Sequence, residues 1–254
     1  AFFGLMLGNV ADLLLMVGLL AGVFHFPTII ALQYMLPRIL ETELMSRSDE
    51  ARQYDEMDYR TVNSRFVADL LEVYPEPKDV LDVGTGTALI PVELCRQVAT
   101  CRVMASDLST AMLEQARYRI EIASMIGRIQ LDRSDAKAML YRDGMFDLVM
   151  CNGTLHQFAD PLEVLYESLR VTAPEGWLFF RDLLRPVDTE TLETLVGTYA
   201  GDGNDQQQLF RQSLQAALSL DEMRAAVAAI GFEPGTVQAT SDRHWTWSAR
   251  KPQA

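Results

Sequence analysis

The chain is poor in cysteine and histidine, with three residues of each among 254. Cys95, Cys101 and Cys151 form no C-x-x-C pair and are odd in number, which argues against a disulfide framework and against a structural zinc site. The histidines are far apart and lack the spacing of metal ligands. We therefore expect no bound metal, a reducing compartment, and cysteines that act as small core residues.

Basic residues are also scarce. The 22 lysines and arginines face 35 aspartates and glutamates, which gives a formal net charge of −13. An acidic surface repels phosphate backbones, and the arginines are scattered along the chain rather than gathered in one patch. These features disfavour a nucleic-acid substrate or partner. The 49% hydrophobic share is typical of a globular protein with a substantial core.

Residues 2–26 form a long hydrophobic run, interrupted by Asn9 and Asp12. A bilayer span needs about 20 apolar residues, so the length suffices, but a carboxylate inside the span costs about 2.5 kcal/mol or more. Three interpretations stay open for residues 1–34: a helical membrane anchor, an amphipathic helix over a lipid-handling site, or sequence from an incorrectly extended reading frame. We expect a cytoplasmic protein. Because basic residues follow the run, an anchored protein would be attached to the cytoplasmic face of the membrane.

The rest of the chain, residues 35–254, is expected to form one domain. Residues 35–74 look helical and amphipathic, and we interpret them as a helical lid that ends before Pro75 and Pro77. Beyond them, short apolar runs alternate with helical patterns, which indicates a parallel sheet with helices on both faces. The predicted strands are 80–83, 102–106, 129–131, 146–150 and 177–180, with 232–238 and 245–250 as an antiparallel pair at the sheet edge.

Helix borders carry their own signals. Asp160 and Pro161 suit a helix start, Ser219 and Glu222 form a capping box, and Gly231 suits a helix end. The predicted fold is α/β: a doubly wound, mostly parallel seven-stranded sheet with a hydrophobic N-terminal helix.

One motif, at residues 80–88, indicates a ligand-binding site. Residues 80–88 read Val-Leu-Asp-Val-Gly-Thr-Gly-Thr-Ala, a predicted strand that enters a glycine loop before a helix. Glycine lets the backbone turn sharply and approach a ligand closely. The dinucleotide fingerprint G-x-G-x-x-G would need a glycine where Leu89 stands. Instead Asp82 precedes Gly84 by two positions, which suits a ligand with a cationic ammonium better than a pyrophosphate.

Polar residues follow the next strands in turn. Asp107 closes the second strand, about where such folds place a carboxylate on ribose hydroxyls. Asp135 and Ala136 follow the third strand, where an adenine ring could be held, and Asn152 follows the fourth. These positions share the carboxyl edge of the sheet, where open α/β sheets bind ligands. The pattern predicts a nucleoside site.

At these residues the chain resembles the class I S-adenosylmethionine (SAM) dependent methyltransferases, particularly the ubiquinone and menaquinone methyltransferase group. The resemblance covers about residues 80–182. It rests on the glycine loop, on Ala-Ser-Asp-Leu-Ser ending at 109, on Asp135-Ala136, on Phe-Asp-Leu-Val at 146–149 with Asn152, and on a segment at 169–178 similar to the family's RVLKPGG.

The resemblance implies a Rossmann-like methyltransferase fold, SAM as the cofactor, and roles for individual residues. Gly84 and Gly86 would line the methionine part of SAM with Asp82 nearby, Asp107 would hold the ribose, and Asp135 with Ala136 the adenine. Ala88 and Glu175 stand where many members have glycine. The full set of implied cofactor-binding residues is Asp82, Gly84, Thr85, Gly86, Asp107, Leu108, Asp135, Ala136 and Asn152.

Beyond the cofactor, the candidates are fewer. His156, after the fourth strand, could act as an acid or base, or could shape the pocket. His244 could contact substrate or cap a strand. Tyr54, Asp55 and Met57 could belong to the lid over the methyl group or to a helix surface.

SAM carries its own electrophile, so the protein mainly aligns a nucleophile for in-line displacement, and it needs a base only if the acceptor must lose a proton. We expect transfer to a small-molecule or lipid-like acceptor. The alternatives are a SAM-binding protein without catalysis and a nicotinamide-dependent oxidoreductase, against which Leu89 and Asp82 count.

Overall fold

The computed structural model describes residues 36–41 and 60–253, which belong to one compact unit. The hydrophobic segment 1–34 and the predicted lid residues Tyr54, Asp55 and Met57 lie outside the described residues. Among the residues that are described, no helix is long and apolar enough to cross a membrane.

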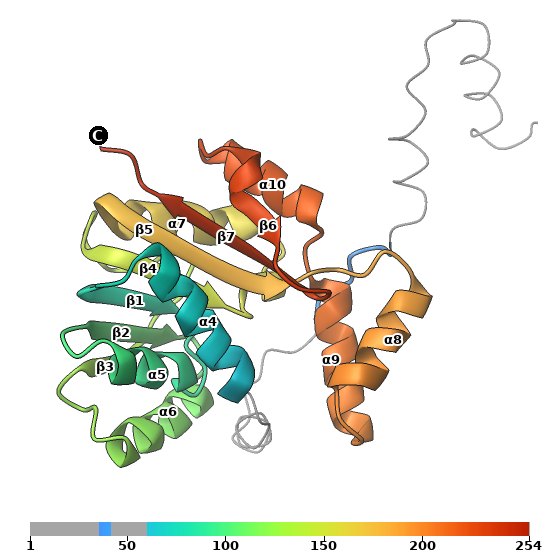
Figure 1. The fold of residues 1–254 in the computed structure, drawn as a ribbon, viewed down its shortest axis with the longest axis horizontal. Helices are drawn as coiled ribbons and strands as arrows, with labels where there is room; N and C mark the ends of the chain where they lie inside the picture. The colour runs from blue at the N-terminus through green and yellow to red at the C-terminus, as the bar shows by residue number, and fades with distance from the viewer. Residues whose placement is uncertain (1–35, 42–59, 254) are drawn as a thin grey trace, which may run out of the picture. The chain divides into compact units, whose positions relative to one another are not determined.

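A seven-stranded sheet organises this unit, with strand order β3-β2-β1-β4-β5-β7-β6 (Figure 1). All neighbouring pairs from β3 to β5 are parallel, whereas β7 runs antiparallel to β5 and to β6. The predicted mostly parallel seven-stranded sheet is confirmed, including the antiparallel pair at one edge, although the strand expected at 232–238 covers only 237–239. The predicted hydrophobic N-terminal helix lies outside the described residues and stays a prediction. The strands are β1 (Asp79–Val83), β2 (Arg102–Asp107), β3 (Ile129–Arg133), β4 (Phe146–Asn152), β5 (Thr172–Leu183), β6 (Val237–Ala239) and β7 (His244–Arg250).

Alternation of side chains along the central strands produces two cores. Val80 and Leu148 pack on one face of the sheet with α4, α5 and α6, whereas Leu81 and Val149 pack on the other face with α7 and α10. Figure 1 shows α4, α5 and α6 together on one side of the sheet. The helices are α4 (Arg60–Val73), α5 (Leu89–Gln97), α6 (Thr110–Ile122), α7 (Pro161–Val171), α8 (Thr189–Tyr199), α9 (Asn204–Ala216) and α10 (Leu220–Ala229), with 3₁₀ turns η1 (Leu155–Gln157) and η2 (Pro234–Thr236).

The predicted helix borders are confirmed where a cap was identified. The Asp160 carboxylate accepts from the Leu162 amide at the start of α7, and Ser219 forms a reciprocal capping box at the start of α10. Gly231 follows the end of α10 with a φ of +91°, a left-handed conformation that favours glycine.

The predicted helix over residues 35–74 was wrong at its beginning. Of the described residues in this range, 36–41 are not helical, whereas α4 covers Arg60–Val73. Pro37 disfavours a helical conformation in the residue before it. The backbone amides of Leu36 and Ile39 donate instead to the carbonyls of Val187 and Gln215, at 3.2 and 3.0 Å.

The two departures from the family's glycine pattern both adopt left-handed backbone. Ala88 has a φ of +60° and Glu175 a φ of +63°. A side chain at such a position costs about 1–2 kcal/mol. The turn at Glu175 survives because neighbouring strands hold it: its amide donates to the Lys251 carbonyl at 3.1 Å, and its carboxylate pairs with Arg250 at 2.6 Å.

We expect Glu175→Gly to be more stable than Glu175→Ala by about 1 kcal/mol. Both variants lose the surface ion pair with Arg250, so their difference is the backbone strain less the extra conformational entropy that glycine loses on folding. Urea unfolding of the two variants measures it. Equal stability would mean that the strain of the left-handed turn does not exceed this entropy.

Candidate functional site

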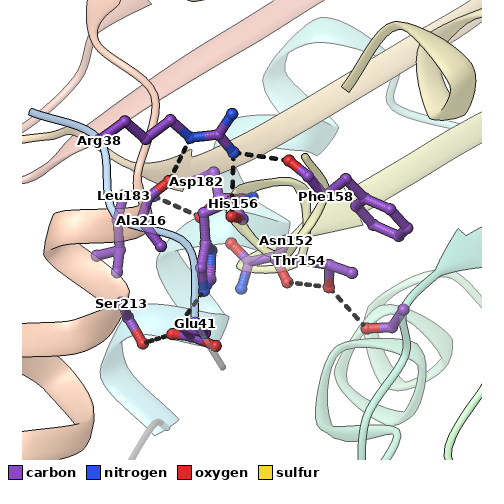
Figure 2. Close-up of polar contacts among 11 residues, drawn as sticks. Arg38, Glu41, Asn152, Thr154, His156, Phe158, Asp182, Leu183, Ser213 and Ala216 are labelled. Carbon is purple, nitrogen blue, oxygen red and sulfur yellow. Dashed lines mark hydrogen bonds and ion pairs between the residues drawn. The ribbon is translucent and has the colours of Figure 1, made fainter. Parts of the chain in front are cut away.

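The loop that follows β1 contains two glycines in a backbone conformation that residues other than glycine rarely adopt. Gly84 and Gly86 have φ values of +69° and +56°. A Cβ atom on Gly84 would lie 2.4 Å from the side chain of Thr154, whereas one on Gly86 would meet nothing within 4 Å. The Thr154 hydroxyl donates to the Gly84 carbonyl at 3.2 Å (Figure 2). The loop is therefore packed against the segment that follows β4.

A cavity of about 420 Å³ opens where β1, β2, β3 and β4 end. Its size is in the range of small-molecule sites. The structure brings together all the residues predicted to hold a cofactor. The residues that line the cavity include Asp82, Gly84, Thr85, Gly86, Asp107, Leu108, Asp135, Ala136 and Asn152.

Asp107 is fixed by the backbone on both sides of its carboxylate. One oxygen accepts from the Gly86 amide at 2.8 Å and the other from the Ser109 amide at 2.8 Å. Burial raises its pKa, and these two amides oppose the increase. Each carboxylate oxygen keeps a further lone pair for a ligand, which makes Asp107 a rigid acceptor for hydroxyl groups.

Asp82 is a carboxyl group without a cation. It is 2% exposed, and no ion pair involves it among the residues that the structure describes. Burial raises the pKa of Asp82 to about 7, against the opposing effect of Thr85 and with a smaller contribution from Asp107 in the same direction. A buried carboxylate of this kind is stabilised when a cation arrives.

The cavity also contains residues that the sequence did not single out. Asn63 comes from α4, Met112 from α6, and Gln157 and Phe158 from the η1 turn. Thr87 contributes a buried hydroxyl that has no hydrogen-bond partner within the described part of the chain. Asn63 is a polar residue on an amphipathic helix, and nothing in the local pattern distinguishes it from a surface residue.

His156 does not line this cavity. It is 5% exposed, and its Nδ1 and backbone amide contact the Asp182 carboxylate at 2.7 and 2.9 Å. Its Nε2 lies 3.5 Å from Glu41 (Figure 2). Burial favours the neutral ring, but Asp182 and Glu41 outweigh it and raise the pKa of His156 to about 10.

At neutral pH His156 is therefore an imidazolium with no lone pair to accept a proton. Its predicted acid–base role gains no support from this geometry and stays a prediction. The alternative role, in shaping the pocket, agrees better with its two carboxylate partners.

His244 lies apart from the cavity, at the start of β7. Its Nδ1 is 3.0 Å from the Ser241 hydroxyl, and burial together with Arg243 and Arg181 lowers its pKa to about 4. Its predicted contact with substrate stays a prediction. The residues predicted as a lid, Tyr54, Asp55 and Met57, lie outside the described ranges.

Comparison with known proteins gives an independent view. A protein-family model described as a methyltransferase domain matches residues 81–180. The chain is 36% identical over 156 residues to a malonyl-[acyl-carrier protein] O-methyltransferase of Halorhodospira halophila, covering 61% of this chain and 50% of that protein. It is 33% identical over 110 residues to a demethylmenaquinone methyltransferase of Deinococcus radiodurans, covering 43% and 45%.

Solved structures agree on the fold. A SAM-dependent methyltransferase from Aquifex aeolicus superposes with a TM-score of 0.63 at 19% identity, covering 80% of this chain and 98% of that one. The chain spans only about half the length of the malonyl-[acyl-carrier protein] O-methyltransferase and of the demethylmenaquinone methyltransferase that it matches.

Proposed function

We propose that this chain, which belongs to the class I SAM-dependent methyltransferases, transfers a methyl group to a small-molecule or lipid-like acceptor. SAM, when bound, would supply an activated methyl group for in-line transfer to a nucleophile of the acceptor, and SAH would be the leaving product. The protein then contributes by binding, aligning and excluding water.

The observation that carries the proposal is the character of the cavity. Within the described ranges, it presents a buried carboxyl group without a cation at Asp82 and an unpartnered buried hydroxyl at Thr87. A ligand with an ammonium group would neutralise the first and could bond to the second. The residues present therefore fit SAM.

Individual roles follow from position along the sheet edge. Asp82 would face the ammonium of the methionine part, and Asp107, held by two backbone amides, would accept from the ribose hydroxyls. Asp135 and Ala136, beyond β3, would flank the adenine. Asn152, at the end of β4, lies beside the glycine loop and would border the methionine part.

The class of acceptor rests on charge and on relatives. A net charge of −13 disfavours polyanionic substrates. Two of the relatives are named as methyltransferases of malonyl-[acyl-carrier protein] and of demethylmenaquinone. We propose an acceptor of similar kind: small or lipid-like, and not a nucleic acid.

The first test is calorimetric titration of the full chain with SAM, S-adenosylhomocysteine (SAH) and NAD. We expect the first two ligands to bind and NAD to give no heat. Asp107→Ala should weaken SAH binding by about 1–3 kcal/mol, the loss expected for hydrogen bonds to a charged group. Asp143→Ala, at an exposed acid outside the cavity, is the control and should bind as the wild type does. Binding of NAD alone would refute the proposal.

A second prediction concerns pH. Because burial raises the pKa of Asp82 to about 7, this group must lose a proton before it can pair with the ligand's ammonium. SAH affinity should therefore rise between about pH 5.5 and 7, by up to tenfold per unit for a single proton. Above that range the affinity should level off, because Asp82 is then ionised.

Asp82→Asn removes this titration and should give weak affinity that hardly changes between about pH 5.5 and 7. Asp107 also lies in the cavity and has a raised pKa, so Asp107→Asn is the matched control. If Asp82→Asn kept the full pH dependence while Asp107→Asn lost it, the titrating group would be Asp107.

A further inference from the structure

A short non-helical segment, residues 36–41, binds across the turn that follows β4. We call it the strap. Its backbone is held at two points, by the Val187 carbonyl after β5 and by the Gln215 carbonyl in α9. Two of its side chains, Arg38 and Glu41, reach the η1 region (Figure 2).

Among the described residues, the Arg38 guanidinium donates only to backbone carbonyls. Its Nε donates to Ala216 at 2.7 Å, and its Nη2 donates to His156 and Phe158 at 3.1 and 2.7 Å. Its Nη1 donates to Ala159 at 3.3 Å. One rigid guanidinium thus ties the end of α9 to three carbonyls of a single turn, a geometry that the fixed fork of arginine allows.

Glu41 forms the second attachment. Its carboxylate accepts from the Ser213 hydroxyl at 2.5 Å and lies 3.5 Å from Nε2 of His156. The same imidazolium is bound on its other side by Asp182. The strap therefore completes a chain of alternating charges, from β5 through His156 to Glu41.

This turn is also a wall of the cofactor cavity. Gln157 and Phe158 line the cavity, and both lie within the segment whose carbonyls Arg38 holds. Thr154, just before η1, contacts the glycine loop. The turn's own backbone bonds, from Gln157 to Thr154 and from Phe158 to Leu155, fix its 3₁₀ shape but not its place relative to α9.

We propose that Arg38 and Glu41 are positioning residues for the cofactor cavity, which act by fixing the backbone of residues 156–159 so that Gln157 and Phe158 face the ligand. The inference rests on the proposed function in that the ligand is SAM or SAH. It differs from a purely stabilising role, because it predicts a loss of ligand affinity beyond any loss of stability.

The experiment compares Arg38→Ala with Arg224→Ala in the full chain. Arg224 also donates to a backbone carbonyl, that of Val237, but it lies on α10 and does not line the cavity. Calorimetry should show SAH affinity about tenfold lower in Arg38→Ala, as for a misplaced binding wall. It should show no change in Arg224→Ala, and the melting temperatures control for stability.

Two further measurements separate positioning from stability. Guanidinium chloride at a few millimolar should restore part of the SAH affinity of Arg38→Ala and leave the wild type unchanged. Arg38→Lys should stay impaired, because one ammonium cannot reach both α9 and the η1 turn with the same geometry. SAH affinity within twofold of the wild type in a folded Arg38→Ala would overturn the proposal.

If Arg38→Ala does not fold, Glu41→Gln takes its place. This variant keeps the size of the side chain and removes its charge, and we expect weaker SAH binding with faster hydrogen exchange at the Gln157 and Phe158 amides. Unchanged affinity and exchange would overturn the proposal. If the wild type binds no SAH, the proposed function fails by itself, and hydrogen exchange at these two amides still decides whether the strap positions the turn.

Discussion

Asp182→Asn is expected to lower the free energy of unfolding by about 3–5 kcal/mol, the loss typical of a buried ion pair that loses one partner. Asp182 is 2% exposed and accepts from three donors: Nδ1 of His156, the His156 amide and the Leu183 amide, at 2.7, 2.9 and 2.6 Å. Asparagine keeps one acceptor oxygen but leaves a buried imidazolium without its main counter-charge.

The matched control is Asp143→Asn. Asp143 also pairs with a basic residue, Arg170, at 2.7 Å, but its side chain is 82% exposed. Exposed pairs of this kind are worth about 0–1 kcal/mol, so the control should unfold almost as the wild type does. Urea unfolding followed by circular dichroism gives both values. Similar losses in the two variants would show that the His156–Asp182 pair is not tightly coupled.

The same pair predicts how stability depends on pH. In the folded protein the pKa of His156 is raised to about 10, above an unfolded value near 6.5, so its ion pair contributes fully below about pH 6.5. That contribution is lost as pH rises toward 10. Asp182 has a lowered pKa, so its contribution is present above its unfolded value of about 4 and is lost in acid. The wild type should therefore lose stability above about pH 6.5, and Asp182→Asn should show a shallower slope.

Much of the sheet could be predicted because its signals are local. Each central strand is a short run of apolar residues, and Gly84 and Gly86 identify the loop after β1 in the sequence. Asp82, Asp107 and Asn152 end up in one cavity because the carboxyl ends of parallel strands meet at one edge. The order of these residues along the chain was therefore enough to predict that they share a site.

The strap could not be predicted, because its contacts are remote in sequence. Arg38 binds carbonyls 118 to 178 positions away. Because every residue has a backbone carbonyl, the sequence does not indicate which carbonyls accept from an arginine. The amphipathic pattern around Met35 favoured a helix, but the backbone of 36–41 bonds to other segments instead. His156 was found by its place after β4, yet its charged state depends on Asp182 and Glu41, which no local pattern connects to it.

Gly84→Ala is expected to destabilise the protein by about 3 kcal/mol, of which about 1–2 is backbone strain and the rest overpacking. The φ of +69° at Gly84 disfavours any side chain, and the added Cβ would lie 2.4 Å from Thr154. Gly86→Ala separates these two effects, because its φ of +56° imposes similar strain while its Cβ would meet nothing within 4 Å. Urea unfolding should therefore place Gly86→Ala only about 1 kcal/mol below the wild type.

Ligand binding should distinguish the same two variants in a second way. Gly86 lines the cavity, and a methyl group there would meet no protein atom within 4 Å, so Gly86→Ala should lose SAH affinity more than stability. In Gly84→Ala the clash falls on Thr154, whose hydroxyl bonds to the Gly84 carbonyl, so stability and affinity should fall together. Adding Thr154→Gly to Gly84→Ala removes the clash, and Thr154→Gly alone measures the cost of losing the Thr154 side chain and its hydrogen bonds. The double variant should therefore lose less stability than the sum of the two single variants, by the overpacking part. If the losses of the two single variants simply added up, contact with Thr154 would not be the reason that this position requires glycine.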